Sequence, residues 1–356
     1  MKKVAVKPYS IITSSLFLLL FTISLFVSGC NDDDDDANPD ASYEQVNLVS
    51  DVATFGASKV DPNLVNAWGM AVGPTGAFWI SSTEKDLTTI YDRLGATLHD
   101  PIEVEGEPTG VIYNSTTDFV IPGTSMVSQF IYVGEEGTVQ AWNSGDATME
   151  VVDNSGEGAV YKGVAMASTG GNNFLYIANF SEAEIEVLDK NFNYVDDMEF
   201  EDSSIPTGFA PFNVQNIDGK LYVMYAKQSV DKYDDVSGAG NGYVNIFNPD
   251  GTLVKRFASQ GTLNSPWGIA KAPDGFDQGS NAILIGNFGD GRINVFNKDG
   301  DYMGQLKDGD ATISIEGLWA LLFPSNGNPT GDQNQLFFTA GPGDEEHGLF
   351  GYLDLR

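Results

Sequence analysis

The sequence predicts an all-β protein folded as a six-bladed β-propeller. The chain has 356 residues, 40 of them glycine, and no long segment shows the apolar period of a helix. An apolar segment recurs six times, with its second residue at positions spaced by 41, 53, 50, 55 and 52 residues. This period is typical of propeller blades, which place four strands in about 40–50 residues.

Two strands recognisable in every unit define the repeat. The first strand is expected at Trp68–Val72, Thr109–Tyr113, Lys162–Met166, Phe212–Asn216, Trp267–Lys271 and Trp319–Phe323. The second is a continuous apolar run, as expected for a strand covered on both faces, at Phe78–Ile80, Phe130–Val133, Phe174–Ile177, Leu221–Met224, Ile283–Ile285 and Leu336–Phe338.

A third strand alternates apolar with more polar residues and ends in Asp or Asn. It is expected at Thr89–Asp92, Val139–Asn143, Ile185–Asp189, Val244–Asn248 and Ile293–Asn297. Asp-Gly pairs follow at Asp250 and Asp299, and they supply the positive φ of a tight hairpin. A fourth strand then leaves the unit, as in Thr252–Phe257.

The two ends of the chain predict how the ring closes. The last unit reaches its third strand near Leu349–Leu355 and then ends, while Gln45–Ser50 is a strand without a unit. Pairing these two strands completes the sixth blade and removes exposed edges. An open pair of sandwiches is the alternative, and the equal spacing favours the ring.

The N-terminal segment predicts export and lipid anchoring. Lys2, Lys3 and Lys7 precede an uncharged stretch that ends in small residues, so residues 1–29 are expected to be a signal peptide. The cut site ends in Cys30 and resembles the lipobox of bacterial lipoproteins. This resemblance implies acylation of Cys30, cleavage before it and membrane attachment through several acyl chains. A transmembrane anchor is the alternative.

Residues 30–43 are expected to form a disordered tether. Asp32–Asp36 are consecutive aspartates, and the segment has nothing apolar to bury. It resembles the acidic export signal of surface-displayed lipoproteins in Bacteroidota-type bacteria. That resemblance implies an outer-membrane lipoprotein facing the cell surface, whereas a solvated spacer facing the periplasm is the alternative. Residues 44–356 are expected to be one propeller domain.

Charge and cysteine content exclude several functions. The formal charge is −32, and removal of the three leader lysines makes it −35. Such a surface repels phosphate backbones, so no nucleic acid is expected as a partner. Once Cys30 is acylated, no thiol is left for a disulfide, a nucleophile or a metal site.

Several motifs resemble those of known propellers. The recurring Gly-Ile-Ala, Leu-Tyr-Val and Ile-x-Val-Phe segments are similar to those of NHL-type six-bladed propellers. The motifs Asp61–Gly69, Ala210–Asn216, Gly238–Gly242, Leu263–Gly268, Gly286–Arg292 and Gly341–Gly348 resemble an uncharacterised family of secreted bacterial propellers. The resemblance supports the fold and implies no activity.

Antiparallel strands place the start of each first strand and the end of each second strand on the same face of the propeller. Polar and aromatic residues at these ends gather around one mouth of the axial channel, which is the expected binding site. The expected ligand-binding residues are Trp68, Lys162, Asn213, Trp267, Asn287 and Trp319. Core packing of the tryptophans and turn closure by the asparagines are the alternatives. Lys162 fills a slot that holds Trp or Phe in other blades, so it should face the channel and pair with Glu316, Asp290 or a bound acid.

A divalent cation such as calcium is a second possibility at this mouth. Oxygen ligands could come from Glu135, Asn179, Asn287, Asp290 and Glu316. The set resembles the single-cation site of lactonase-type six-bladed propellers. The long loop between Lys227 and Gly242 contains the acidic run Asp231–Asp235 and could act as a lid. Plain solvation of these acids is the alternative.

Nucleophilic catalysis has little support in the sequence. There are two histidines, His99 and His347, and no nucleophile-elbow motif. His347 follows Asp344, Glu345 and Glu346, whose charges would raise its basicity. It is a candidate general base, with a solvated loop histidine as the alternative, and in a metal-assisted hydrolase a glutamate could serve as base instead. The leading hypothesis is a binding module for a small molecule, glycan or protein, and the competing one is a metal-assisted hydrolase or lactonase.

Overall fold

The computed structural model describes residues 1, 38, 41–276, 278–279, 281–324 and 333–356. The chain divides into two units, Met1–Asp34 and Asp35–Arg356, and the second contains the predicted propeller. The predicted signal peptide, the Cys30 acylation site and most of the predicted tether lie outside the described residues. None of the helices within the described ranges is long and apolar enough to span a membrane.

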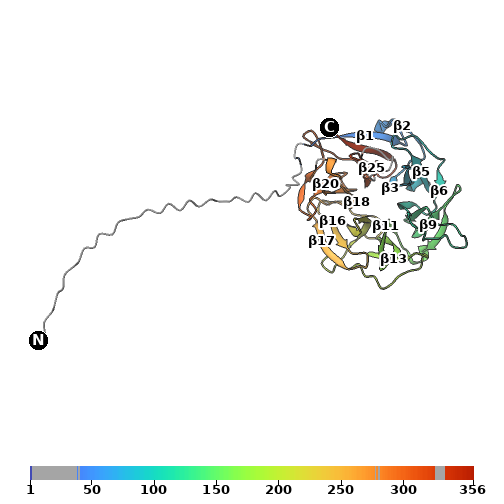
Figure 1. Ribbon diagram of the computed structural model, residues 1–356. Coiled ribbons are helices and arrows are strands. Elements are labelled where there is room, and N and C mark those ends of the chain that lie inside the picture. Colours follow the sequence, from blue (N-terminus) through green and yellow to red (C-terminus); the bar gives the residue numbers. More distant parts are fainter. Residues whose placement is uncertain (2–37, 39–40, 277, 280, 325–332) are drawn as a thin grey trace, which may run out of the picture. The chain divides into compact units, whose positions relative to one another are not determined.

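Six sheets arranged around an axis form the second unit, which confirms the predicted propeller (Figure 1). Blades 1 and 2 contain β3 (Ala67–Val72), β4 (Phe78–Ser82), β5 (Leu87–Tyr91), β6 (Ile102–Glu103), β7 (Pro108–Tyr113), β8 (Phe130–Gly134), β9 (Thr138–Trp142) and β10 (Met149–Asp153). Blade 3 contains β11 (Tyr161–Thr169), β12 (Asn172–Asn179) and β13 (Glu184–Asp189).

The other half of the ring follows in chain order. Blade 4 contains β14 (Phe209–Ile217), β15 (Lys220–Lys227), β16 (Gly242–Phe247) and β17 (Leu253–Ser259), and blade 5 contains β18 (Pro266–Lys271), β19 (Ile283–Asn287), β20 (Ile293–Phe296) and β21 (Tyr302–Gln305). A hairpin of β22 (Lys307–Asp308) and β23 (Ala311–Thr312) precedes blade 6, with β24 (Leu318–Leu322), β25 (Leu336–Ala340) and β26 (Leu349–Leu355).

The ring closes as the chain ends predict. The N-terminal strand β1 (Tyr43–Ser50) pairs antiparallel with β26, and Val46 lies opposite Tyr352. The short strand β2 (Lys59–Val60) then adds to the outer side of β1 in parallel. Blade 6 therefore joins both ends of the propeller chain, and this pairing leaves β26 without a free edge.

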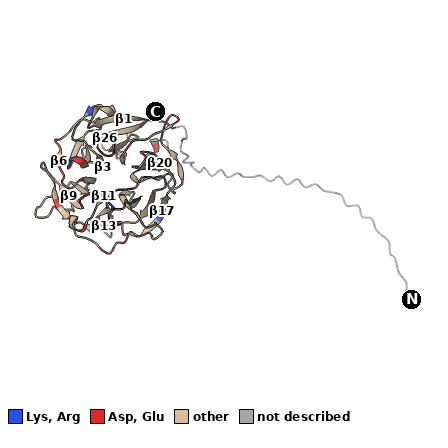
Figure 2. Cartoon of the chain, turned by 180° about the vertical axis from the view of Figure 1, so that it is seen from behind, with Lys and Arg blue, Asp and Glu red and all other residues tan. Residues whose placement is uncertain are grey.

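The first strand of each blade lines the axis. Each of these inner strands contacts the next one around the ring, and β24 contacts β3 to complete the circle. Apolar clusters fill the spaces between blades, as between Phe78 of blade 1 and Phe337 and Phe350 of blade 6. Figure 2 shows the ring from behind, with its charged residues marked.

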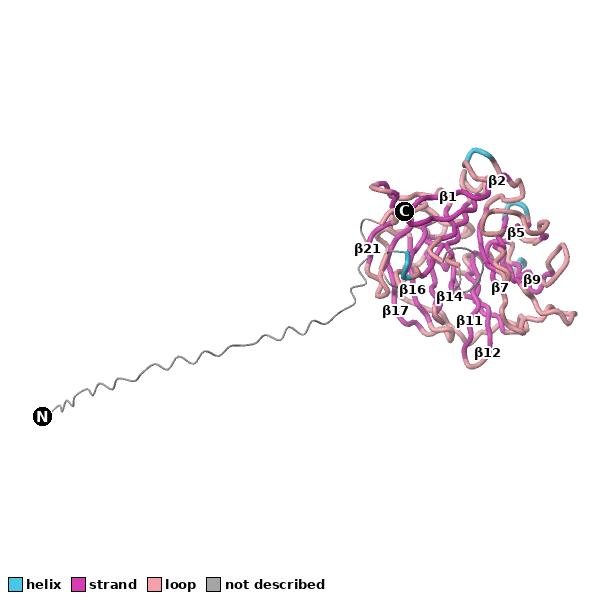
Figure 3. The backbone as a smooth tube through the Cα atoms, turned by 45° about the horizontal axis from the view of Figure 1, so that its top comes forward, coloured by secondary structure: helices cyan, strands magenta, loops and turns pink. Residues whose placement is uncertain are grey.

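Short helical turns are the only helices in the described part of the propeller, as Figure 3 shows. They are η1 (Ala53–Phe55), η2 (Thr83–Lys85), η3 (Ser155–Glu157) and η4 (Asp274–Phe276). Their scarcity matches the all-β composition.

Blade 3 departs from the predicted four strands. After a single bridge between Leu188 and Tyr194, the chain leaves the edge of β13 without forming a fourth strand. Met198, Phe200 and Ile205 pack into the apolar cluster shared with blade 4. Burial of these side chains between the blades draws the segment away from the sheet edge.

Candidate functional site

A β-bulge near the start of every inner strand builds the centre of the propeller. The pairing of each inner strand with its neighbour shifts register at the same point of the repeat. A bulge bends its strand and redirects a side chain. One residue in each register shift occupies the same position of the repeat. These residues are Trp68, Thr109, Lys162, Phe212, Trp267 and Trp319. Five of these six residues are uncharged, and four of the five are aromatic. Lys162 is the one charged residue of the set.

The aromatic members of this set form a stack within the propeller core. Trp68 and Trp319 lie face to face, with ring centroids 3.7 Å apart and planes 13° apart. Phe288 stacks on the opposite side of Trp319 at 3.9 Å, and Trp267 meets Trp319 edge-on at 5.9 Å. The exposed fractions of Trp68, Trp267 and Trp319 are 1%, 5% and 1%. The faces of these rings therefore pack against one another, whereas the sequence analysis expected the tryptophans to line an open mouth of the channel.

Hydrogen bonds fix the stack to the backbone around it. Trp319 Nε1 donates to Asn66 Oδ1 at 2.9 Å, and Trp267 Nε1 donates to the Lys162 carbonyl at 3.0 Å. Asn213 Nδ2 donates to the Trp267 carbonyl at 2.9 Å. Trp68 Nε1 is buried and has no hydrogen-bond partner among the described residues. Asn213 therefore binds the backbone at Trp267 and belongs to the packed core.

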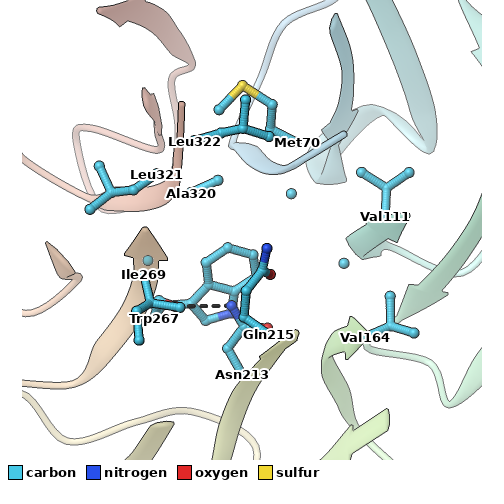
Figure 4. A pocket seen from close by; sticks show the side chains of 13 residues that line it. Met70, Val111, Val164, Asn213, Gln215, Trp267, Ile269, Ala320, Leu321 and Leu322 are labelled. Atoms are coloured by element: carbon cyan, nitrogen blue, oxygen red, sulfur yellow. Dashed lines mark hydrogen bonds between the residues drawn. The ribbon is translucent and has the colours of Figure 1, made fainter. Parts of the chain in front are cut away.

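Beyond the stack, the described inner strands enclose a small cavity on the axis. Asn213 and Trp267 line it together with Gln215, Met70 and Leu322, as Figure 4 shows. Its volume is about 30 Å³. A single water requires at least about 10–15 Å³ by this measure, so the cavity has room for one or two waters and not for an organic ligand. This cavity is therefore not the ligand site, and the mouth of the channel is the next candidate.

Lys162 lies at the mouth formed by the inner-strand starts, and its partner is Glu135. The two side chains form a buried ion pair, and their residues are 2% and 9% exposed. Three rings surround the ammonium: the Nζ lies 5.3 Å from the Trp68 centroid, 5.9 Å from Phe180 and 5.0 Å from Tyr233. The sequence analysis expected Glu316, Asp290 or a bound acid beside Lys162, and in the structure its partner is Glu135.

Other carboxylates gather around this ion pair. Glu345 accepts a 2.7 Å hydrogen bond from Asn66 Nδ2, and Asp235 accepts one from Ser265 Oγ. Burial, and then the charge of Glu135, raise the pKa of Glu345 to about 7. Burial also raises the pKa of Glu135 and Asp235, and the Lys162 ammonium opposes both shifts. One ammonium is insufficient to neutralise the surrounding carboxylates.

The long loop between β15 and β16 covers this mouth. Tyr233 Oη donates to Glu107 Oε2 at 2.9 Å, and Lys232 Nζ donates to the Ser181 carbonyl at 3.1 Å. On the other side, Gly238 N–H donates to Asn264 Oδ1 at 2.6 Å. These bonds join the loop to the ends of three other blades. We refer to the group Glu107, Glu135, Lys162, Tyr233, Asp235 and Glu345 as the Lys162 mouth.

The structure does not bring together the residues proposed to hold a metal. Only Asn287 and Asp290 touch, at 3.0 Å, while Glu135 pairs with Lys162. Asn179 bonds to Glu186 at 2.6 Å, and Glu316 accepts the Gly343 N–H at 3.2 Å. Both asparagines also accept backbone N–H groups, as turn-closing residues do. Within the described residues, no group of three or more His, Cys, Asp or Glu could hold a metal ion.

The two histidines lie apart from the Lys162 mouth. His347 Nδ1 contacts Asp51 Oδ2 at 2.8 Å, and its ring meets Phe55 edge-on. His99 is exposed, and its Nδ1 contacts the Asp100 carbonyl at 2.6 Å. In the loop that contains His347, it is Glu345 that reaches the axial cluster. The candidate base of the sequence analysis thus lies two residues from the group that the geometry favours.

Sequence reasoning missed four members of the Lys162 mouth as site residues, namely Glu107, Tyr233, Asp235 and Glu345. The loops that contain Tyr233, Asp235 and Glu345 were identified, but nothing in the repeat indicates which loop side chain turns inward. Glu107 and Glu345 have φ values of 54° and 68°. This conformation is unusual for a residue with a Cβ and redirects the side chain, but the sequence does not reveal it.

Comparison with known proteins identifies a viral relative and two related folds. No family model matches the chain. "Uncharacterized protein R648" of Acanthamoeba polyphaga mimivirus is 35% identical over 330 residues, covering 87% of this chain and 80% of the viral protein. The bacterial origin expected from the sequence is not supported by this relative, and it stays a prediction.

Two solved structures share the arrangement of blades. An auxiliary nutrient binding protein from Bacteroides ovatus aligns with a TM-score of 0.57 and 11% identity, over 89% of this chain and 77% of that chain. Virginiamycin B lyase from Staphylococcus aureus aligns with a TM-score of 0.52 and 10% identity, over 89% of this chain and 100% of that chain. At these identities the likeness shows the propeller fold alone.

Proposed function

The chain belongs to the family of "Uncharacterized protein R648" of Acanthamoeba polyphaga mimivirus, and we propose that it is a ligand-binding propeller whose ligand is held at the Lys162 mouth. One observation carries the proposal: a buried lysine, enclosed by rings and carboxylates, lies beneath a loop that spans the mouth. Burial of a charge is costly unless the charge is paired, and a buried ion pair often adds little net stability, so stability alone does not account for this centre. Convergence of several blades on one polar centre is a common basis for a ligand site.

The charges favour a ligand with a positive group. Glu107, Glu135, Asp235 and Glu345 face one ammonium, and burial raises the pKa of the last three. A ligand ammonium or guanidinium would relieve this excess of negative charge through charge-assisted hydrogen bonds. Of the small molecule, glycan and protein ligands expected from the sequence, a small amine or a basic side chain fits best.

The loop between β15 and β16 supplies the lid in this proposal. It contributes Tyr233 and Asp235 to the mouth, and it is attached by hydrogen bonds whose partners lie on other blades. Breaking a few hydrogen bonds at the loop tip would open the mouth without disturbing the strands. Lids of this kind sequester a ligand from water once it is bound.

Calorimetric titration of the purified protein with arginine and spermidine tests the proposal, with glucose and citrate as neutral and anionic comparisons. We expect binding of the cationic probes only. Glu345→Gln should weaken it by about tenfold, since hydrogen bonds to charged groups contribute about 1.5–3 kcal/mol. Glu346→Gln, an exposed neighbour, is the matched control. Equal binding of all four probes, or no effect of Glu345→Gln, would contradict the proposal.

Proton-transfer chemistry at the same mouth is the second candidate. A carboxyl with a pKa of about 7 is suited to general acid–base catalysis near neutral pH, and Glu345 has this property. A hydrolase or lactonase would then use Glu345 in place of His347. Its metal-assisted form predicts stoichiometric calcium in the purified protein and a lower Tm after EDTA. An unchanged Tm with no metal present would remove that form.

We also propose that the propeller is held at an outer-membrane surface by acyl chains on Cys30. Support comes from the leader pattern and from the acidic segment after Cys30. Cys30→Ser should release the protein from the membrane fraction, and labelled palmitate should no longer be incorporated. Retention of the variant in membranes would overturn this part of the proposal.

A further inference from the structure

The outer edge of blade 3 is only partly paired. In β13, the Val187 carbonyl accepts the Val195 N–H at 2.9 Å, and Leu188 bridges Tyr194. The chain then departs, whereas β10, β17 and β21 continue as fourth strands in blades 2, 4 and 5. Blade 3 therefore has an edge where its neighbours have a strand.

Strand geometry shows which backbone groups this edge presents. Because the Val187 carbonyl points away from β12, the backbone of Ile185, two residues earlier, points the same way. Among the described residues, neither the outward N–H nor the carbonyl of Ile185 has a backbone partner. Unpaired groups of this kind act as a template for an added strand.

A groove lies beside this edge. It has a volume of about 560 Å³ and extends from β13 to the segment 194–201. Ligand pockets commonly measure 300–1,000 Å³, so the groove can hold several residues of peptide. Its charged lining residues are all acidic: Glu182, Glu184, Glu186, Asp196, Glu199 and Glu201.

We propose that the edge of β13 binds an extended basic peptide as the missing fourth strand of blade 3. The guest backbone pairs with Ile185, and a Lys or Arg side chain of the guest lies opposite Glu184, which is exposed. Glu186 is buried and accepts hydrogen bonds from Tyr161 and Asn179, so it adds negative charge to this face without a free oxygen for the guest. Side chains on one face of a sheet repeat every second residue, so alternate guest positions present their cations to the acidic face. This site is separate from the Lys162 mouth.

Electrostatics select a basic partner over a second copy of the chain. Burial and the charges of Glu186 and Glu182 raise the pKa of Glu184, so these carboxylates repel one another. A second copy would bring the same acidic edge and add to that repulsion. A basic strand removes it, and each opposite-charge pair across strands contributes about 0.2–1 kcal/mol.

The groove also predicts where the guest has an apolar residue. A second hollow of about 610 Å³ shares Ala183, Phe200 and Glu201 with the first one. Ile205 and Phe209 give it an apolar wall. A guest strand that passes Ala183 would therefore place an apolar side chain there.

Fluorescence anisotropy with labelled Lys-Val-Lys-Val-Lys-Val tests the proposal on the purified protein. Two comparison peptides are Lys-Lys-Lys-Val-Val-Val, of equal charge, and the alternating peptide with N-methylated amides. We expect the alternating peptide to bind at least fivefold more tightly than either one. Hydrogen exchange should show new protection at the Ile185 amide.

Variants distinguish strand addition from adsorption to an acidic surface. Ile185→Pro removes the outward N–H but no bond to β12, and we expect at least tenfold weaker binding with an unchanged circular dichroism spectrum. Glu184→Gln should weaken binding about two- to fivefold, and Glu150→Gln on the outer strand of blade 2 should not. Equal binding of all three peptides, or binding insensitive to Ile185→Pro, would overturn the proposal, as would no binding at all.

Discussion

Tyr233 Oη and Glu107 Oε2 form a 2.9 Å hydrogen bond although 126 residues separate them. The bond joins the loop after β15 to the turn before β7, on the far side of the axis. The backbone of Glu107 has a φ of 54° in a tight turn, and this conformation directs the side chain toward Tyr233. The mouth is thus closed by side chains rather than by the strands of the propeller.

Loss of this hydrogen bond should loosen the loop. Tyr233→Phe retains the ring over Lys162 but removes the donor, so opening of the loop should increase about fivefold, corresponding to about 1 kcal/mol. Hydrogen exchange of residues 228–241 measures it. Val230→Ala, at a fully exposed position in the same loop, should leave exchange unchanged. Equal exchange in Tyr233→Phe and the parent would show that Tyr233 does not hold the loop.

The buried ion pair should be costly to break and inexpensive to replace. Lys162→Met leaves the Glu135 carboxylate without its cation and should lower the free energy of unfolding by about 3–5 kcal/mol. Lys162→Met combined with Glu135→Leu should restore most of this loss, because apolar replacement of a buried pair is often neutral. Urea unfolding of both variants measures the difference. A double variant as unstable as the single one would contradict this reasoning.

The repeat made the fold predictable from the sequence. Second residues of the inner strands, such as Gly69 and Gly268, recur because backbones approach closely there: a Cβ on Gly69 would lie 2.2 Å from the Thr109 carbonyl oxygen. Closure by β1 followed from the absence of a fourth strand after Leu355. These features arise from local pattern and from edge pairing, which one sequence reveals.

The site was predictable only where the repeat reached it. Lys162 was found because it occupies a repeat position that is otherwise uncharged. The partner Glu135 was assigned to the cation set, because the sequence does not show which loop carboxylate meets the ammonium. The stacking of Trp68 on Trp319 depends on rotamers at two bulges, and periodicity carries no information about rotamers.

Stability should decrease as pH rises through the neutral range. Folding raises the pKa of Glu345 from 4.5 to about 7, so the folded state retains a proton that the unfolded state loses. The stabilising contribution of this proton is complete below pH 4.5 and is lost as pH rises through about 7. Glu135 and Asp235 act in the same direction.

Glu345→Gln should flatten this dependence, because an amide does not titrate. Thermal unfolding between pH 4.5 and 8 should show a smaller fall in Tm for Glu345→Gln than for the parent or for the exposed control Glu346→Gln. Identical slopes in all three proteins would show that Glu345 contributes nothing to the pH dependence.

The aromatic stack should be a main source of stability at the axis. Trp319→Ala removes the ring between Trp68 and Phe288 and leaves a void, which should lower the free energy of unfolding by about 3–5 kcal/mol. Trp319→Phe retains an aromatic ring but loses the bond to Asn66, so a smaller loss of about 1–3 kcal/mol is expected. Tyr302→Ala, at a position 48% exposed on the outer strand of blade 5, is the control and should change stability by less than about 1 kcal/mol. Urea unfolding and near-ultraviolet circular dichroism measure the series. If Trp319→Ala matched the control in stability and spectrum, the stack would not stabilise the ring.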